Sequence, residues 1–284
     1  MYFLCKIYIE FCFKMPEPSI FGAKISHSRH LHTRNGGKTM IYTRRICISG
    51  CEEHPFHRDQ KLSDAAGFEV FTCLANGCFC TSLHTGNLQD PREQKRASAA
   101  VGKILAGCLT GKRILAAGIG NPLVTPDSLG PRCISRLIPS PDSTPSLFTT
   151  APDIPARTGM DTARLVRGTA KTARADCIIT VDALSAQSEE NLASVIQITD
   201  MGNTPGSGTD TAVSGKISTG TMGIPVISVG VPTVIARNGL LVTNADCDST
   251  AEIFSRVIAY GILNALFRRR EIYRTRRQSD VTQT

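Results

Sequence analysis

Short apolar runs that alternate with helical segments are the feature of this 284-residue chain that most restricts its fold. Beyond Asp90, runs of continuously apolar residues are separated by stretches whose apolar residues recur at helical spacing. Strands of this kind occur in parallel sheets that helices cover on both sides. The sequence therefore predicts an α/β fold, a single domain with a mainly parallel central sheet flanked by helices.

The same periodicity predicts the bounds of individual elements. A helix is expected after Asp90, because Pro91 stands at a permitted first-turn position and Gly111 follows the last apolar position. The next helix is expected to begin at Pro131 and to run to Leu137, since a proline inside a helix removes a hydrogen bond and clashes. The other predictions are strands at 39–49, 68–74, 113–119, 175–182, 195–199 and 224–230, and helices at 165–173 and 247–267.

Composition indicates an intracellular globular protein. The 41% share of hydrophobic residues is enough for a core, and eleven cysteines, odd in number and irregularly spaced, fit a reducing cytoplasm. The apolar opening MYFLCKIYIEFCFK is interrupted by Lys6 and Glu10, and no small-residue cleavage site follows it. It is a poor signal peptide and too short to span a bilayer. No other run is a membrane candidate.

Three regions are expected along the chain. Residues 1–70 form a divergent or poorly ordered N-terminal region, a candidate propeptide, and residues 71–267 form the α/β domain. Residues 268–284 form a basic tail, in which the run 268–277 carries six arginines against one glutamate. We expect this tail to be solvated and frayed, and attraction to an acidic protein or a nucleic acid is the alternative.

Several familiar motifs are incomplete. Gly118-Ile-Gly120 lacks the third glycine of a dinucleotide loop, and the stretch from Gly208 to Lys216 has six residues between its glycines where a P-loop has four. The cysteines and histidines of the first 90 residues contain no C-x2-C pair, and no histidine follows position 84. We therefore expect no nucleotide, no metal, no cofactor and no serine triad.

Two acids remain as candidates for chemistry. Asp127 follows one predicted strand by a few residues, and Asp182 stands at the predicted end of another. Each has a local structural alternative, a helix start for Asp127 and a cap for Asp182. Because sites in such sheets form beyond the carboxyl ends of the strands, the two acids are expected to meet. Two close carboxylates can share one proton and activate water.

Four blocks of sequence resemble the germination protease family of endospore-forming bacteria, over about 118–267. They are GIGNPLVTPDSLGP at 118–131, IITVDALSAQS at 178–188, IQITDMGNTPGSG at 196–208 and MGIPVISVGVPTVI at 222–235. The chain departs from this pattern at Gln187, where the family usually has arginine, and in a shortened segment after Val234. Residues 1–70 do not match the family's propeptide or mature start.

The resemblance implies an atypical aspartic endopeptidase that degrades small acid-soluble spore proteins at germination. It also implies a phosphorylase/hydrolase-like fold, synthesis as a zymogen, a homotetramer and a cytoplasmic location in the spore core. By motif match, Asp127 and Asp182 are the catalytic pair. Neither a membrane nor a direct nucleic-acid partner is expected. The residues expected to contact substrate are Gly118, Gly120, Asn121, Ser185, Gly206 and Gly208, although a plain turn is an equal alternative for 206–208.

Two other functions stay open. The opening block also resembles that of the hydrogenase-maturation endopeptidases, which recognise nickel in their substrate through two acids and a downstream histidine. No histidine follows Asp182 here, and this favours the spore-protease interpretation. The second alternative is a catalytically inactive homologue that only binds spore proteins.

Overall fold

A computed structural model describes residues 57–75, 77–206, 215–238 and 240–281 of the chain. The strand expected at 39–49 lies outside these residues. The elements, in chain order, are β1 (His57–Ala65), β2 (Phe68–Ala75), β3 (Cys78–His84), α2 (Pro91–Cys108), β4 (Arg113–Gly118), η1 (Thr125–Asp127), α3 (Leu129–Ile134), β5 (Ser146–Thr150), α4 (Pro155–Thr158), α5 (Thr162–Ala173), β6 (Cys177–Ala186), η2 (Glu189–Asn191), β7 (Val195–Thr199), α6 (Thr219–Met222), β8 (Val226–Arg237), β9 (Leu240–Val242) and α7 (Cys247–Val281).

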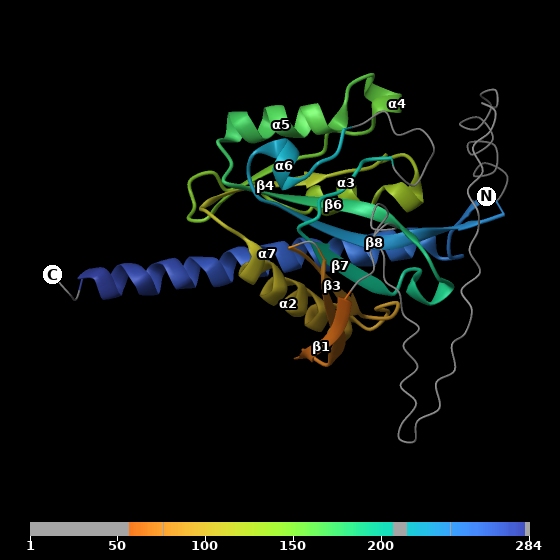
Figure 1. The fold of residues 1–284 in the computed structure, drawn as a ribbon, viewed down its shortest axis with the longest axis horizontal. Coiled ribbons are helices and arrows are strands. Elements are labelled where there is room, and N and C mark those ends of the chain that lie inside the picture. Colours follow the sequence, from red (N-terminus) through yellow and green to blue (C-terminus); the bar gives the residue numbers. More distant parts are fainter. Residues whose placement is uncertain (1–56, 76, 207–214, 239, 282–284) are drawn as a thin grey trace. The chain divides into compact units, whose positions relative to one another are not determined.

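One nine-stranded sheet joins the strands in the order β1-β2-β3-β7-β8-β6-β4-β5, with β9 paired to β8 (Figure 1). The neighbours β5, β4, β6 and β8 run parallel to one another. The remaining pairs are antiparallel. The prediction of an α/β domain with a central sheet flanked by helices is confirmed, and the parallel pairing is confined to the four strands β5, β4, β6 and β8.

Helices cover both faces of the sheet. The larger core lies under α2, α3 and α7, and the smaller one lies under α5 and α6 on the other face (Figure 1). Along β6, Ile179 and Val181 belong to the larger core, whereas Ile178 belongs to the smaller one. Because side chains alternate along a strand, Asp182 shares the α5 and α6 face with Ile178 and Thr180.

The expected end of β6 at Asp182 is wrong. β4 ends at Gly118, which pairs with Val181, so Asp182 is the first residue of β6 that lies beyond β4. On the other side β8 continues to pair with β6, from Asp182 with Gly230 to Ala186 with Ile235. This continued pairing extends β6 to Ala186, and it likewise carries β8 past the expected end at Gly230 to Arg237.

The expected start of α3 at Pro131 is also wrong, because the helix spans Leu129–Ile134. Pro131 occupies its third position. The first four N–H groups of a helix have no partner within the helix, so a proline there removes no hydrogen bond. By contrast, the helix expected after Asp90 is confirmed. The Asp90 side chain accepts a hydrogen bond from the Arg92 N–H at 2.8 Å, and Pro91 begins the helix.

The closing helix continues through the segment that was expected to be a frayed tail. It was predicted to end at Phe267, but α7 runs to Val281. Arg269 donates to the carbonyl oxygen of Leu109 at 2.6 Å, and the Tyr273 hydroxyl donates to that of Gly111 at 2.6 Å. These bonds dock α7 on the end of α2, and arginine is itself a good helix former. At the other end of the chain the sheet begins at His57, inside the region 1–70.

Part of α7 is apolar enough, by length and composition, to cross a membrane. This part spans Cys247–Thr275 and has a mean hydropathy of 1.2, but 67% of its most apolar window is buried within the protein. Its buried residues, among them Phe254, Val257 and Ile258, belong to the core shared with α2 and α3. The packing of a core helix therefore accounts for its composition.

Candidate active site

Asp127 is the last residue of η1, a single helical turn between β4 and α3. Its carboxylate oxygen Oδ2 accepts a hydrogen bond from the backbone N–H of Asn121 at 2.7 Å. Gly120, with φ of +122°, lies against it, and a Cβ at this position would come within 2.0 Å of the Asp127 carbonyl oxygen. The sequence therefore folds the Gly120–Asn121 turn directly onto Asp127, where only glycine fits.

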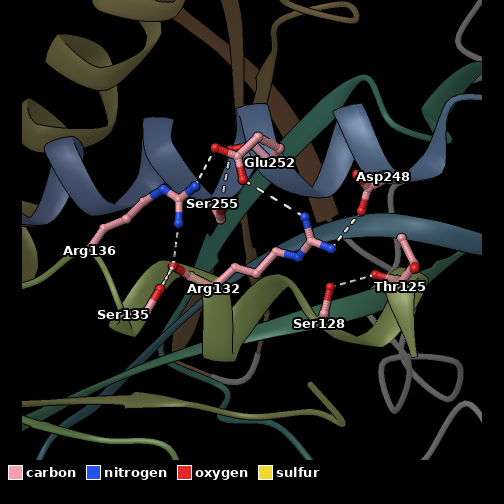
Figure 2. Close-up of polar contacts among 8 residues, drawn as sticks. All are labelled: Thr125, Ser128, Arg132, Ser135, Arg136, Asp248, Glu252 and Ser255. Carbon is pink, nitrogen blue, oxygen red and sulfur yellow. Dashed lines mark hydrogen bonds and ion pairs between the residues drawn. The ribbon is translucent and has the colours of Figure 1, made fainter. Parts of the chain in front are cut away.

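Several contacts fix η1 and the helix that follows it. The Thr233 hydroxyl of β8 donates to the Pro126 carbonyl oxygen at 2.7 Å, and the Ser128 hydroxyl donates to that of Thr125 at 2.7 Å. Figure 2 shows how α3, which follows directly, is joined to α7: Arg132 pairs with Asp248 at 2.6 Å, and Arg136 pairs with Glu252. The turn that carries Asp127 is thus attached to both the sheet and the closing helix.

Asp182 lies on β6 beside the end of β4. The side-chain amide of Asn203 donates to its Oδ2 atom at 2.9 Å. The Thr180 hydroxyl donates to Asn203 Oδ1 at 3.2 Å and is hydrogen-bonded to Ser228 Oγ at 2.9 Å. Since Oδ1 of Asn203 receives this hydroxyl, its amide nitrogen must face Asp182. A buried polar chain from β8 through β6 to Asn203 therefore orients the second carboxyl group.

The two carboxyl groups are half-buried, and the charge of Asp127 acts on the protonation of Asp182. Burial raises the pKa of Asp182 to about 7, and the charge of Asp127 raises it further, against the hydrogen bonds from Asn203 and the Ala183 N–H. Burial also raises the pKa of Asp127 to about 6, opposed by the Asn121 N–H and helped by the charge of Asp153. Both carboxyl groups therefore titrate closer to neutral pH than an exposed aspartate does.

The other predicted substrate contacts lie at varying places around this pair. Gly118 packs against α3, where a Cβ would lie 2.3 Å from the Gly130 carbonyl oxygen. Ser185 lies three residues beyond Asp182 on β6, and within the described part of the chain no hydrogen bond joins it to either carboxyl group. Gly206 stands in a turn with φ of +79°, and Gly208 lies outside the described residues. Their roles stay predictions.

Four residues of this region were not predicted to take part. Asn203 and Thr180 hold Asp182, while Asp153 and Arg157 lie beside Asp127 and Asn121. Asn203 stands in the block at 196–208, four residues past the end of β7, so a polar residue in the loop that follows a strand was the available signal. No comparable signal marks Asp153 or Arg157, which lie 26 or more residues from Asp127 in sequence.

The site was expected to hold no metal ion. In the ranges that the structure describes, no three His, Cys, Asp or Glu side chains gather as a group that could hold an ion. Some of the cysteines and histidines of the first 90 residues, namely Cys47, Cys51 and His54, lie outside those ranges. The expectation of a metal-free site therefore stays a prediction.

The fold and the site together define a class of protein. It is an α/β domain in which the half-buried carboxyl groups of Asp127 and Asp182, both with raised pKa values, lie near the end of β4, and the charge of Asp127 raises the pKa of Asp182. Residues 89–238, more than half of the chain, match the family model described as germination protease. The chain belongs to the germination protease family.

Curated relatives in three bacteria show the same family. Germination proteases are 35% identical over 158 residues in Geobacillus sp. (strain WCH70), 38% over 133 in Clostridium acetobutylicum and 32% over 163 in Bacillus subtilis (strain 168). These matches cover 52%, 43% and 51% of this chain and 42%, 40% and 44% of the relatives. The chain thus matches less than half the length of each relative.

One solved structure with some similarity is a [NiFe] hydrogenase maturation protease, HycI, from Thermococcus kodakarensis KOD1. It is 19% identical, with a TM-score of 0.39, and the match covers 56% of this chain and 99% of that chain.

Proposed function

We propose that this protein is an endopeptidase that hydrolyses small acid-soluble spore proteins during spore germination, with Asp127 and Asp182 as the pair that activates water. The observation that carries the proposal is the electrostatic coupling of the two carboxyl groups, because the Asp127 charge helps to raise the pKa of Asp182 to about 7. Membership of the germination protease family supports the peptidase class.

The pair can divide acid and base work. Asp127, with a pKa of about 6, is ionised at neutral pH and accepts a proton from water. Asp182, with a pKa of about 7, retains its proton and donates it to the peptide carbonyl oxygen. The water oxygen bonds to the carbonyl carbon to give a tetrahedral diol. Asp127 then returns its proton to the amide nitrogen, the C–N bond breaks, and Asp182 recovers its proton from the diol.

Asn121 is the proposed donor to the developing oxyanion. Its backbone N–H already holds Asp127, so its side chain lies within the same turn. A preorganised amide donor at such a place stabilises the charge that develops on the carbonyl oxygen. The segment around Gly206 and Gly208 is the proposed rim of the substrate groove. The homotetramer, the zymogen and the location in the spore core stay predictions.

The direct test mixes the purified protein with a small acid-soluble spore protein and follows cleavage by mass spectrometry. Asp127→Asn and Asp182→Asn preserve side-chain shape and remove one titrating group each. Each is expected to lower kcat by about 100-fold or more. Asp142→Asn, a change of an exposed loop acid, is the matched control and should cleave at the parent rate.

Each possible result has a definite meaning. If both variants cleave as fast as the parent, the carboxyl pair is not the catalytic machinery. If the parent binds the spore protein but leaves it intact across pH 5 to 8, the inactive binding homologue is correct instead.

A further inference from the structure

Arg157 lies beside Asn121 and Asp153, and within the described residues no ion pair joins it to either carboxyl group of the proposed pair. It stands on α4, the short helix that follows β5, and its side chain is one-third exposed. Its Nε atom pairs with Asp153 Oδ2 at 2.8 Å, and its Nη1 atom makes a long hydrogen bond of 3.5 Å to Asn121 Oδ1. One guanidinium group therefore joins Asp153, whose charge helps to raise the pKa of Asp127, with Asn121, whose backbone N–H holds Asp127.

The carboxamide of Asn121 is fixed in one orientation. Its Oδ1 atom accepts from the Leu123 N–H at 3.0 Å and from Arg157. Both partners are donors, so the oxygen of the amide must face them and its NH2 group must face away. Within the described residues, that NH2 group has no hydrogen-bond partner, although Asn121 is 3% exposed as a whole. A donor is thus available next to Asp127.

Asp153 is held in place at a conformational cost. Its φ is +65°, a region that non-glycine residues seldom adopt and that costs on the order of 1–3 kcal/mol. Its Oδ1 atom accepts from the Ile154 N–H at 2.8 Å, and its carbonyl oxygen accepts from the Thr162 hydroxyl at 3.0 Å. These bonds leave Oδ2 for Arg157 and set a negative charge near Asp127. Among the described residues, Asp153 and Asp182 interact electrostatically with Asp127, and Arg157 pairs with Asp153.

We propose that Arg157 is a positioning residue for the catalytic pair. It holds Asn121 so that the side-chain NH2 faces the substrate carbonyl, and it balances the charge of Asp153 next to Asp127. The first role follows from the two donors at Asn121 Oδ1, and the second from the 2.8 Å ion pair. This inference rests on the proposed function, because it assigns work to a residue through the water-activating pair.

The test compares Arg157→Gln, Arg157→Lys, Asp153→Asn and the double variant Arg157→Gln/Asp153→Asn. kcat and KM are measured on a small acid-soluble spore protein from pH 5 to 8. The matched control is Arg164→Gln, on the neighbouring helix α5, where the side chain is 85% exposed. The Asp127 pKa is followed in the same proteins by carbon-13 carboxyl titration, which needs no activity.

Arg157→Gln is expected to lower kcat by about tenfold or more with KM little changed, because the oxyanion donor loses a fixed position. It also leaves Asp153 unbalanced, so the Asp127 pKa and the acidic limb of the pH profile move upward. Asp153→Asn removes the negative charge, so the Asp127 pKa and the acidic limb of the pH profile both move downward. In the double variant, the acidic limb of the pH profile returns toward its position in the parent, but kcat stays as low as in Arg157→Gln. In Arg157→Lys, the acidic limb keeps its position in the parent and kcat is higher than in Arg157→Gln.

If Arg157→Gln has the same kcat as the parent, with or without a rise in KM, the positioning role is overturned. An Asp127 titration that does not move in Arg157→Gln overturns the charge-balancing role. The proposed function fails separately, when the parent cleaves nothing or when Asp127→Asn retains full activity. The carboxyl titration still decides in that case whether Arg157 controls Asp127.

Discussion

The side-chain amide of Asn203 donates to the carboxylate of Asp182 at 2.9 Å, from a segment that no β-ladder joins to β6. Asn203 is itself fixed by its backbone, whose N–H and carbonyl pair with Ile217 at 2.9 and 2.8 Å. The donor is therefore rigid, and its orientation is determined by Thr180 on the other side. Asn203 thus supplies Asp182 with a neutral donor, beside the Ala183 N–H, to set against the nearby charge of Asp127.

Asn203→Asp replaces that donor with a carboxyl group of the same shape. A third acid beside Asp182 disfavours its ionised form, so the Asp182 pKa is expected to rise above about 7. The alkaline limb of the activity profile, which reports loss of the Asp182 proton, should therefore move to higher pH. The measurement is kcat/KM against pH. Asn264→Asp, an exposed change on α7, is the control, and an unmoved alkaline limb would contradict the prediction.

The raised pKa values also predict how stability changes with pH. Asp127 and Asp182 have model-peptide pKa values of 3.8 and native values of about 6 and about 7. Between about pH 4 and 7 the native state binds more protons than the unfolded state, so the free energy of unfolding falls as pH rises. Their stabilising contribution is present below about pH 4 and is lost above about pH 7.

Asp182→Asn removes the larger part of this dependence. The variant is expected to be more stable than the parent at pH 8, on the order of 1–2 kcal/mol after allowance for its partial exposure, and equally stable at pH 4. Urea unfolding at both pH values measures the difference. Asp142→Asn should show the same difference from the parent at both pH values. A variant that loses stability on going from pH 4 to pH 8 as steeply as the parent would disprove the assignment.

A methyl group at Gly120 tests the turn that supports Asp127. Gly120→Ala places its Cβ within 2.0 Å of the Asp127 carbonyl oxygen and 3.0 Å of Oδ1, at φ of +122°. Because backbone atoms must move, we expect a loss of about 3 kcal/mol in stability, together with most of the activity. Gly168→Ala on α5 meets nothing within 4 Å and should stabilise the protein by about 0.5–1 kcal/mol. Thermal unfolding of both variants decides the comparison.

The sequence was sufficient to predict most of the elements around the candidate pair, and it singled out Asp127 and Asp182 as that pair. Continuous apolar runs identified β4, β6 and β7, and the Asp90 cap with Pro91 identified α2. These signals are local, since they depend on residues within one element. The rule that sites form at strand ends then placed Asp127 and Asp182 together, and their electrostatic coupling agrees with it.

Features that depend on tertiary contacts could not be predicted. β6 passes Asp182 only because β8 pairs with it up to Ala186, and α7 extends past Phe267 with Arg269 and Tyr273 bound to the end of α2. The supporting residues have the same origin. Arg157 reaches Asn121 across 36 residues of sequence, and Asn203 reaches Asp182 across 21. No periodicity within a segment records such contacts.

The ion pairs between α3 and α7 yield the last prediction, because they attach the Asp127 turn to the closing helix (Figure 2). Glu252 contacts both Arg136 and Arg132, and these side chains are 42%, 27% and 28% exposed. A double-mutant cycle with Arg136→Gln and Glu252→Gln is expected to give a coupling free energy of about 1 kcal/mol that falls at 1 M salt. Urea unfolding measures it.

The control pair is Arg274 and Glu271 on α7, which are 66% and 49% exposed and 3.4 Å apart. Its coupling should not exceed about 0.3–0.5 kcal/mol, the value for an exposed pair within one helix. Partial burial reduces the solvent screening of the Glu252 ion pairs. Because Glu252 has two partners, less side-chain entropy is lost per contact. The coupling free energy of the Glu252 cycle should therefore exceed that of the control cycle. Equal coupling in the two cycles would show that these ion pairs do not hold α3 on α7, and that the fixed position of Asp127 depends on Thr233 and the buried core instead.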